Sequence, residues 1–184
     1  MEIFDIVDEY GLPTGETVER KTAHREGIRH RTAHVWVIRE RAGRFEVLLQ
    51  KRSMNKDSFP GRLDTSSAGH IPAGSDPVES ALRELKEELG LDAAPGELTL
   101  IGRFDIQYEL PFHGVLFRDN EVSHVYVLRR DLPASDFVIQ QEELESVEWR
   151  DAGTVDADLQ RHDPAYCVPR GGWALLMQYL QTQK

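Results

Sequence analysis

One amphipathic segment near the middle of the chain, residues 75–91 (SDPVESALRELKEELGL), constrains the fold more than any other feature. Its apolar residues recur at helical spacing and form one stripe, made by Val78, Ala81, Leu82, Leu85 and Leu89. Ser75 or Asp76 can cap the first turn, and Gly90 suits the left-handed residue that often ends a helix. The segment therefore predicts a helix that packs one face on a core and leaves the opposite face wet and charged.

Strand-like runs on both sides of this helix predict a sheet. Residues 33–39 and 45–51 are rich in β-branched and apolar residues and flank a glycine-containing turn, which indicates an antiparallel hairpin. Further strands are expected at residues 98–104, 121–129 and 145–149, and a last helix is expected at residues 172–182. Because strands and helices are interleaved without regular βαβ units, the pattern indicates an α/β fold with a mixed sheet covered by helices.

Two long connections stand out between these elements. Residues 52–75 hold many turn formers and predict a loop with one short strand near residues 63–67. Residues 105–120 (DIQYELPFHGVLFRDN) predict an irregular connection that lines a pocket and sets selectivity.

Length and composition limit the class of protein. The 184 residues predict a single domain over residues 1–184. There is no apolar run near the ~18 residues of a membrane span, and the one cysteine, Cys167, cannot form an internal disulfide. We read Cys167 as a packing residue and expect a cytoplasmic location without membrane contact. With 22 Lys and Arg against 32 Asp and Glu, the net charge of −10 disfavours a nucleic acid polymer as partner.

Positive charge is nonetheless concentrated in the first third of the chain. Residues 20–31 (RKTAHREGIRHR) form a basic cluster, and more basic residues follow between residues 51 and 62. The candidates for binding the phosphates of a small anion are Arg31, Lys51, Arg52 and Lys56. The alternative for any one of them is an ordinary solvated surface residue.

Three carboxylates share the wet face of the predicted helix. Glu84, Glu87 and Glu88 stand at i, i+3 and i+4, so their side chains lie within a few ångströms of one another. Each like-charged pair at this spacing costs about a few tenths of a kcal/mol unless a cation lies among the oxygens. Carboxylate oxygens suit Mg²⁺ or Mn²⁺. The spacing by itself also allows a solvated acidic face without any metal.

The residues around these acids carry a longer pattern. From Gly69 to Leu91 the sequence GHIPAGSDPVESALRELKEELGL resembles the Nudix box, and Ser75 alone departs, where the family has its first Glu. The matching positions are Gly69, Arg83, Glu84, Leu85, Glu87, Glu88, Gly90 and Leu91. The resemblance implies a Nudix-type α/β/α sandwich with a mixed β-sheet, divalent cations on the helix carboxylates, and homodimerisation, which no residue pattern demonstrates.

The resemblance extends beyond the box to a particular branch of the family. The segments HRTAHVWVI and DNEVSHVYVL look like the branch that includes type I isopentenyl diphosphate isomerases and related hydrolases. Ala68 stands where the isomerases have a catalytic Cys, and a methyl group cannot deliver a proton. The chain also keeps whole the Arg-Glu and Glu-Glu pairs of the box, which are incomplete in the isomerase sequences. Both differences favour hydrolysis of a diphosphate bond, in a nucleoside diphosphate derivative or a prenyl diphosphate.

The resemblance also implies roles for individual residues. The candidate metal ligands are Glu84, Glu87, Glu88, Glu121 and the carbonyl of Gly69. The catalytic candidates are the same four glutamates and Arg83, which we expect to organise the carboxylates. Bound cations would neutralise the substrate oxygens and position or acidify an attacking water. Glu142 and Glu143 are rival outer carboxylates, with a solvated turn as their alternative.

The histidines and aromatic residues leave alternatives open. His30 and His70 match metal-binding histidines of the isomerase branch, but a structural or phosphate-facing role is open for His24, His30 and His34. Six aromatic side chains could stack on a base, line a prenyl pocket or fill the core. They are Trp36, Phe59, Phe104, Tyr108, Phe112 and Phe117.

Two rival functions follow from the same residues. An isomerase of prenyl diphosphates would keep the family site without releasing phosphate, and Ala68 argues against it. A binding module without turnover is the other rival, and Ser75 is its one support in the sequence.

Overall fold

The computed structural model describes residues 1–56 and 58–183. The strands are β1 (Ile3–Val7), β2 (Pro13–Glu19), β3 (His30–Arg41), β4 (Arg44–Arg52), β5 (Leu63–Asp64), β6 (Ser67–His70), β7 (Thr99–Phe112), β8 (Val115–Arg129) and β9 (Leu144–Asp151). The helices are α1 (Arg20–Glu26), α2 (Pro77–Leu89), α3 (Ala152–Gln160) and α4 (Arg170–Gln181), with 3-10 turns at Pro95–Glu97 and Ala134–Asp136. Among the described helices, none is long and apolar enough to cross a membrane.

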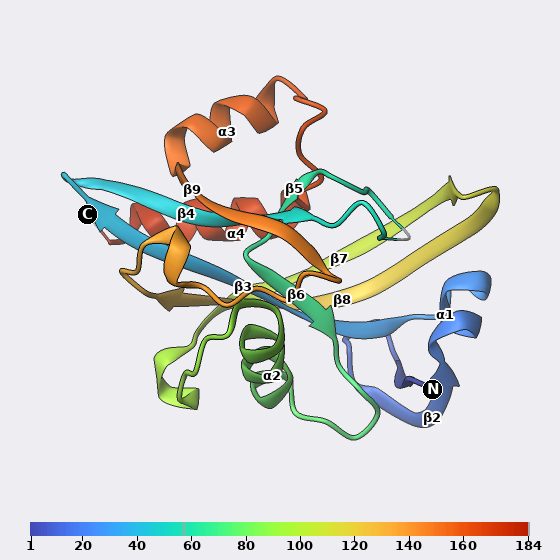
Figure 1. The fold of residues 1–184 in the computed structure, drawn as a ribbon. Helices are drawn as coiled ribbons and strands as arrows, with labels where there is room; N and C mark the ends of the chain where they lie inside the picture. Colours follow the sequence, from blue (N-terminus) through green and yellow to red (C-terminus); the bar gives the residue numbers. More distant parts are fainter. Residues whose placement is uncertain (57, 184) are drawn as a thin grey trace.

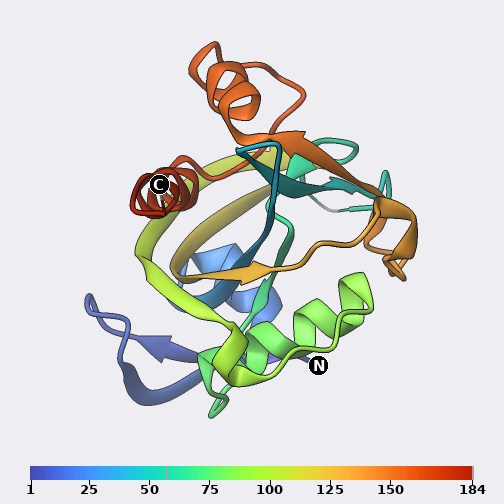
Figure 2. The same ribbon diagram turned by 90° about the vertical axis from the view of Figure 1, so that its left-hand side faces the viewer.

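A mixed sheet forms the middle layer of the molecule (Figure 1). Its main path runs β5, β4, β3, β8 and β7, while β6 pairs with β3 and β9 pairs with β4. The pair β3 and β8 is parallel, and the other pairs are antiparallel. Figure 2 shows α2 on one side of this sheet and α3 and α4 on the other. The predicted α/β fold with a mixed sheet between helices is therefore confirmed.

Each face of the sheet has its own apolar core. Successive residues of β3 point to opposite faces, so Val35 packs with Leu85 of α2, whereas Trp36 packs with Trp173 of α4. The rings of Trp36 and Trp173 meet edge to face at 5.5 Å. The buried stripe of α2 includes Ala81, Leu85 and Leu89, as its spacing predicts.

Local sequence signals locate two elements well. The predicted hairpin is β3 and β4, joined by Ala42 and Gly43, which both have positive φ. That geometry is typical of a two-residue turn between twisted strands. In α2, the side chain of Asp76 accepts hydrogen bonds from the backbone N–H groups of Val78 and Glu79, and Gly90 has φ 67°. Asp76 rather than Ser75 is therefore the helix cap.

Two connections differ from the sequence interpretation. The prediction of an irregular connection at residues 105–120 is wrong. Instead, β7 and β8 continue as a pair of strands, here called the β7–β8 arm, up to a turn at His113 and Gly114. Residues 105–110 alternate polar and apolar residues, which is a strand signal, but the turn formers Pro111 and Gly114 that follow indicate a break. The loop at residues 52–75 contains two short strands, β5 and β6, instead of one.

The N-terminal residues form a unit that the sequence patterns did not indicate. β1 and β2 pair with each other, α1 follows, and Phe4, Val18 and Ala23 are buried between them. The backbone N–H of Ala73 donates to the carbonyl of Ile3, which joins this unit to the loop before α2. In Figure 1 the unit lies below the β7–β8 arm, and α1 contacts β8.

Candidate active site

Glu88 points from α2 to the backbone of β6. Its Oε2 accepts hydrogen bonds from the Ser67 hydroxyl at 2.7 Å and from the backbone N–H of Ala68 at 3.2 Å. Glu88 is only 5% exposed, and this burial raises its pKa to about 8, against the opposing effect of the hydrogen bond from Ser67. A buried carboxyl group held at a fixed place is suited to accept a cation, which would favour its ionised form.

Glu84, one helical turn earlier, lies against Gly69. A side chain at Gly69 would overlap the carboxyl group of Glu84, so glycine is required there for the close approach. Burial raises the pKa of Glu84, and the guanidinium of Arg83 opposes this shift. The Nη2 of Arg83 donates to Oε1 of Glu84 at 2.7 Å and to the carbonyl of His70 at 3.2 Å. Arg83 thereby fixes Glu84 relative to β6.

Glu87 occupies a different environment from its two neighbours. Its side chain is 55% exposed, and its Oε2 lies 3.9 Å from Nε of Arg83. The three predicted helix carboxylates are therefore divided: Glu84 and Glu88 lie against β6, and Glu87 lies at the solvent side of the same helix.

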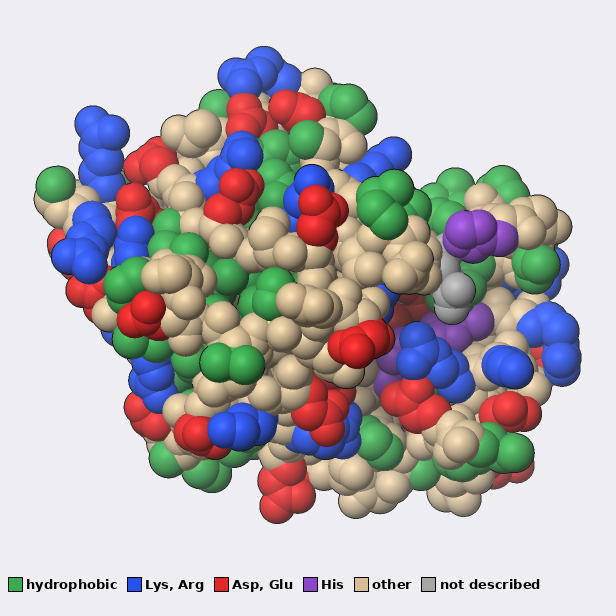
Figure 3. Space-filling model, viewed as in Figure 1, with side chains coloured by type: hydrophobic (Ala, Val, Ile, Leu, Met, Phe, Trp, Pro, Cys, Tyr) green, Lys and Arg blue, Asp and Glu red, His purple; other side chains and the backbone are tan. Residues whose placement is uncertain are grey.

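A second cluster forms where four elements meet. His24 of α1, His30 of β3, His70 of β6 and Glu121 of β8 offer ligand atoms that all lie within 4.8 Å of one another. The parallel register places His30 beside Glu121, whose Oε1 lies 3.7 Å from Nε2 of His30 and 3.5 Å from Nε2 of His70. Figure 3 shows histidine and acidic side chains set in a recess of this face.

Buried atoms of this cluster lack partners among the described residues. Nε2 of His30, Nε2 of His70 and Oδ1 of Asp119 are buried without a hydrogen bond. Oδ1 of Asp119 lies 3.7 Å from Nε2 of His24. Buried polar atoms are usually paired, so a set of imidazole and carboxylate groups left unpaired around one point fits a divalent cation.

The electrostatics of the cluster favour neutral imidazoles at His24 and His70 and an ionised Glu121. Burial lowers the pKa of His24 to about 4 and also lowers that of His70. Burial alone would raise the pKa of Glu121, but the neighbouring His30 and His70 outweigh it and lower the net pKa. Burial and the charge of Glu121 raise the pKa of Asp119 to about 8. Neutral imidazole nitrogens and a carboxylate are the forms that bind metal.

The predicted phosphate-binding residues are divided by the fold. Lys56 pairs with Glu143, and its charge also acts on Glu88, so it lies near the helix carboxylates. Arg52 pairs with Asp64 at 3.0 Å, and its charge acts on the side chain of Tyr108 in the β7–β8 arm. The basic side chains of Lys56 and Arg52 therefore lie near the candidate site.

The other two predicted phosphate-binding residues have different partners. Lys51 is 40% exposed and pairs with Glu145 at 3.0 Å. Arg31 is buried and pairs with Asp5 of the N-terminal unit at 2.9 Å. The structure thus gives Arg31 a contact between the sheet and the N-terminal unit instead of a place beside the carboxylates. Glu142 and Glu143 lie in the turn before β9.

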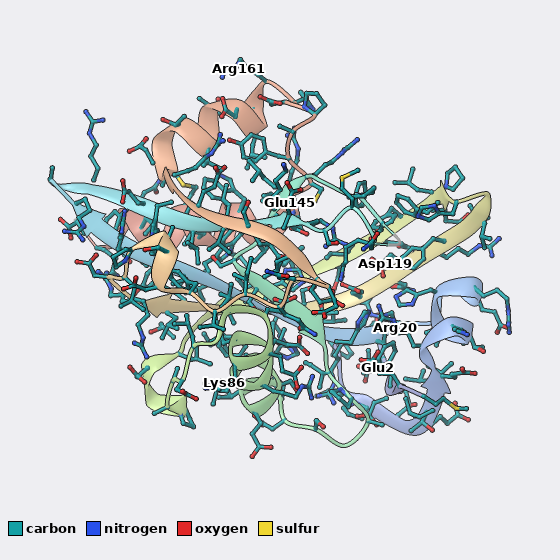
Figure 4. The ribbon with its side chains drawn as sticks, viewed as in Figure 1. Glu2, Arg20, Lys86, Asp119, Glu145 and Arg161 are labelled. Carbon is teal, nitrogen blue, oxygen red and sulfur yellow. The ribbon has the colours of Figure 1, made fainter. Side chains whose placement is uncertain are left out.

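The sequence interpretation did not name Asp119, and it gave His24 a structural or phosphate-facing role instead of a place among the candidate metal ligands. Figure 4 labels Asp119 on the β7–β8 arm, above Arg20 and Glu2 of the N-terminal unit. Asp119 stands two residues before Glu121 and so shares its face of β8, which was a usable signal. His24 comes from α1, and no local sequence pattern predicts how α1 packs onto the sheet.

Comparison with known proteins identifies the family of this chain. The NUDIX domain family matches residues 28–170. Nudix hydrolase 3 of Arabidopsis thaliana is 38% identical over 167 residues, which cover 90% of this chain and 21% of that longer protein. An isopentenyl-diphosphate Delta-isomerase of Jannaschia sp. is 32% identical over 143 residues, which cover 77% of this chain and 75% of the relative.

A solved structure agrees at the level of the fold. DR0079 from Deinococcus radiodurans superposes with a TM-score of 0.65 at 20% sequence identity, over 87% of this chain and 90% of that one. The relatives confirm the predicted resemblance to Nudix hydrolases and to the branch with isopentenyl diphosphate isomerases. Together with the sandwich fold and the box on α2, these matches show that the chain belongs to the Nudix family.

Proposed function

We propose that the protein hydrolyses the phosphoanhydride bond of a small diphosphate compound with the help of Mg²⁺ or Mn²⁺. One observation carries the proposal: the buried carboxylate of Glu88 and the largely buried carboxylate of Glu84 converge on the short strand that contains Gly69. Nothing in the packing of α2 requires acids at these positions, and burying them lowers stability unless cations are bound. Family membership supports the same reaction, because the Nudix family acts on small-molecule diphosphates.

The kinds of ligand atom in the two clusters support a proposal for which residues hold which ion. Glu84, Glu88, the carbonyl of Gly69 and the outer Glu87 would hold Mg²⁺ or Mn²⁺ through oxygen. His24, His30, His70 and Glu121 offer nitrogen and oxygen together, which suits Mn²⁺ or another transition metal better than Mg²⁺. Bound divalent cations neutralise phosphate oxygens and lower the pKa of a coordinated water.

The chain's own residues prepare this site before substrate arrives. Ser67 and the backbone of Ala68 fix the carboxylate of Glu88, and Arg83 fixes that of Glu84. Thr32 donates to Oε2 of Glu121 at 3.1 Å and fixes a third carboxylate. Lys56 and Arg52 supply positive charge that can bind the substrate phosphates. Fixed groups of this kind lower the reorganisation needed in the transition state.

The cluster of histidines and Glu121 also favours the isomerase as a second candidate, because it matches the metal-binding histidines of that branch. Ala68 argues against it, since the isomerase reaction needs a group at that place that can give or take a proton. Incubation with isopentenyl diphosphate separates the two: hydrolysis releases inorganic phosphate, and isomerisation moves the double bond and releases none.

A panel of diphosphate compounds with and without Mg²⁺ tests the proposal. We expect Mg²⁺-dependent release of phosphate or a monophosphate from at least one compound. Glu88→Gln should lose nearly all of this activity, whereas Glu79→Gln, on the exposed first turn of the same helix, should keep it. Tight binding of a nucleoside diphosphate without cleavage of any compound would establish the binding module instead.

Further statements about partners are proposals of the same kind. The net charge of −10 supports a small substrate and not a nucleic acid polymer. A homodimer, absence of membrane binding and a cytoplasmic location are predictions that light scattering and cell fractionation would test.

A further inference from the structure

The ring of Phe4, in β1, lies nearly parallel to two imidazoles of the histidine cluster, the name used here for His24, His30, His70 and Glu121. Its centre is 4.8 Å from that of His30, with 12° between the planes, and 4.6 Å from that of His70, with 14° between the planes. The two imidazoles are themselves 5.3 Å apart. Phe4 is fully buried. One phenyl ring, which cannot bind a metal itself, therefore contacts two candidate metal ligands.

The three histidines differ in what holds their rings. Nδ1 of His24 lies 3.0 Å from the carbonyl oxygen of Arg20, and Nδ1 of His30 lies 2.8 Å from that of Ile28. A carbonyl oxygen accepts, so each of these Nδ1 atoms carries the hydrogen and leaves Nε2 to face the cluster. In the part of the chain that the structure describes, Nε2 of His70 is buried without a hydrogen bond. Packing therefore has to orient the ring of His70.

The backbone of His70 is fixed, but the rotation of its ring is not fixed in the same way. β6 pairs with β3 so that His70 lies opposite Thr32. The torsion that joins the imidazole to Cβ has broad minima. Nε2 of His70 lies 3.5 Å from Oε1 of Glu121, and rotation of the ring would turn this nitrogen away from the other ligand atoms. The face of Phe4 lies against the ring and limits this rotation.

Phe4 is itself attached to the segment that follows His70. It forms an antiparallel β-bridge with Pro72, two residues after the histidine. At the next residue, the backbone N–H of Ala73 donates to the carbonyl of Ile3 at 2.8 Å. Phe4 lies outside the residues that the Nudix family match covers, so family membership does not account for this contact.

We propose that Phe4 is a positioning residue, which holds the imidazole of His70 with Nε2 directed into the histidine cluster before a metal ion binds. The inference rests on the proposed function, because it assigns His70 to a metal centre. Phe4 acts only through the histidine. A phenyl ring presents a flat face to an imidazole, whereas an aliphatic side chain fills the space without favouring one ring orientation. A ligand that is already oriented loses less freedom when the metal binds, so removal of the ring should weaken binding.

Metal binding measured by calorimetry tests the proposal. The relevant Mn²⁺ site is the one that is missing in His70→Gln. Phe4→Leu keeps an apolar side chain and removes the ring, and we expect it to raise Kd for this site about tenfold, as for the loss of outer contacts at other metal sites. Phe4→Tyr keeps the ring and should keep the wild-type Kd. If Phe4→Leu does not fold, Phe4→Met removes the ring with a smaller change of volume.

Val18→Ala is the matched control for a loss of packing. Val18 belongs to the same small core as Phe4 but offers no ring to an imidazole. Both Val18→Ala and Phe4→Leu should lower the free energy of unfolding of the metal-free protein, and only Phe4→Leu should raise Kd for Mn²⁺. The proposal is overturned if Phe4→Leu binds Mn²⁺ as tightly as the wild type, or if Val18→Ala weakens binding equally.

NMR of the metal-free protein separates this inference from the proposed function. The imidazole of His70 should give one set of narrow ring signals in the wild type and exchange-broadened signals in Phe4→Leu. If the wild type takes up no Mn²⁺ at this site, the proposed metal centre fails, while the broadened His70 signals would still show that Phe4 orients the ring. Ring signals of His70 that are the same in both proteins would refute the positioning role.

Discussion

The carboxyl group of Glu84 occupies the space that a side chain at Gly69 would need. This contact joins the first residue of the Nudix box to a carboxylate at its centre, although fifteen positions separate them in the chain. It explains in physical terms why the box specifies glycine there, because α2 must bring its acids against the backbone of β6.

Substitution of Gly69 tests this contact directly. Gly69→Ala should displace Glu84 and lower Mg²⁺-dependent turnover about 100-fold, since displacement of a catalytic group by about 1 Å has effects of that size. Gly96→Ala is the matched control, because an added methyl group there meets no atom within 4 Å. Circular dichroism should show both variants folded. Full activity in Gly69→Ala would remove Glu84 from the site.

Metal analysis tests the second cluster. His70→Gln should lower the number of Mn²⁺ ions bound per chain by one, because it removes one of the grouped ligand atoms. His124→Gln is the control, since residue 124 alternates to the opposite face of β8 from Glu121. Equal Mn²⁺ content in wild type and His70→Gln, measured after dialysis, would show that the cluster holds no ion.

The fold predicts different effects for two neighbouring lysines. Lys56→Gln should raise KM about tenfold, because a charge-assisted contact to phosphate is lost near Glu88. Lys51→Gln should leave KM unchanged, since Lys51 is exposed and already pairs with Glu145. Steady-state kinetics with one substrate suffice for the comparison, and a larger effect at Lys51 would contradict this placement of the two residues.

Arg31 is predicted to act on stability. Arg31→Met removes the ion-pair partner of half-buried Asp5 and should lower the free energy of unfolding by about 2 kcal/mol, as for the loss of a hydrogen bond to a charged group. The exposed pair of Arg41 and Asp131 provides the control, and Arg41→Met should leave stability close to wild type. Urea unfolding measures both. A rise in KM at Arg31→Met without loss of stability would restore the sequence-based assignment of Arg31 to phosphate binding.

Cys167 is predicted to be unreactive in the folded protein. Burial, with a smaller effect from nearby Asp64, raises the pKa of its thiol, so the reactive thiolate is scarce even at mildly alkaline pH. A thiol reagent at pH 8 should label the native chain far more slowly than the chain in urea. Cys167→Ala should keep turnover, and rapid native labelling would show that the thiol is accessible.

Much of the fold can be predicted from this sequence because its signals are local. The apolar stripe of α2, its cap at Asp76 and its end at Gly90 depend on residues within a few positions of one another. The hairpin of β3 and β4 follows from two runs rich in β-branched and apolar residues that flank a glycine-containing turn. The continuous β7–β8 arm could not be predicted in the same way, because Pro111 and Gly114 interrupt the alternating pattern, and the pairing of the two strands depends on backbone hydrogen bonds.

The sequence by itself determined the family, the sheet with its central helix, and the three acids that share one helical face. The tertiary structure alone decided how far each acid is sheltered from water, since Glu88 is buried and Glu84 is 16% exposed against β6, whereas Glu87 is 55% exposed. It also brought His24, His30, His70 and Glu121 together from four elements. Spacing along one element determines which side chains share a face, whereas burial and contact between elements depend on how the whole chain packs.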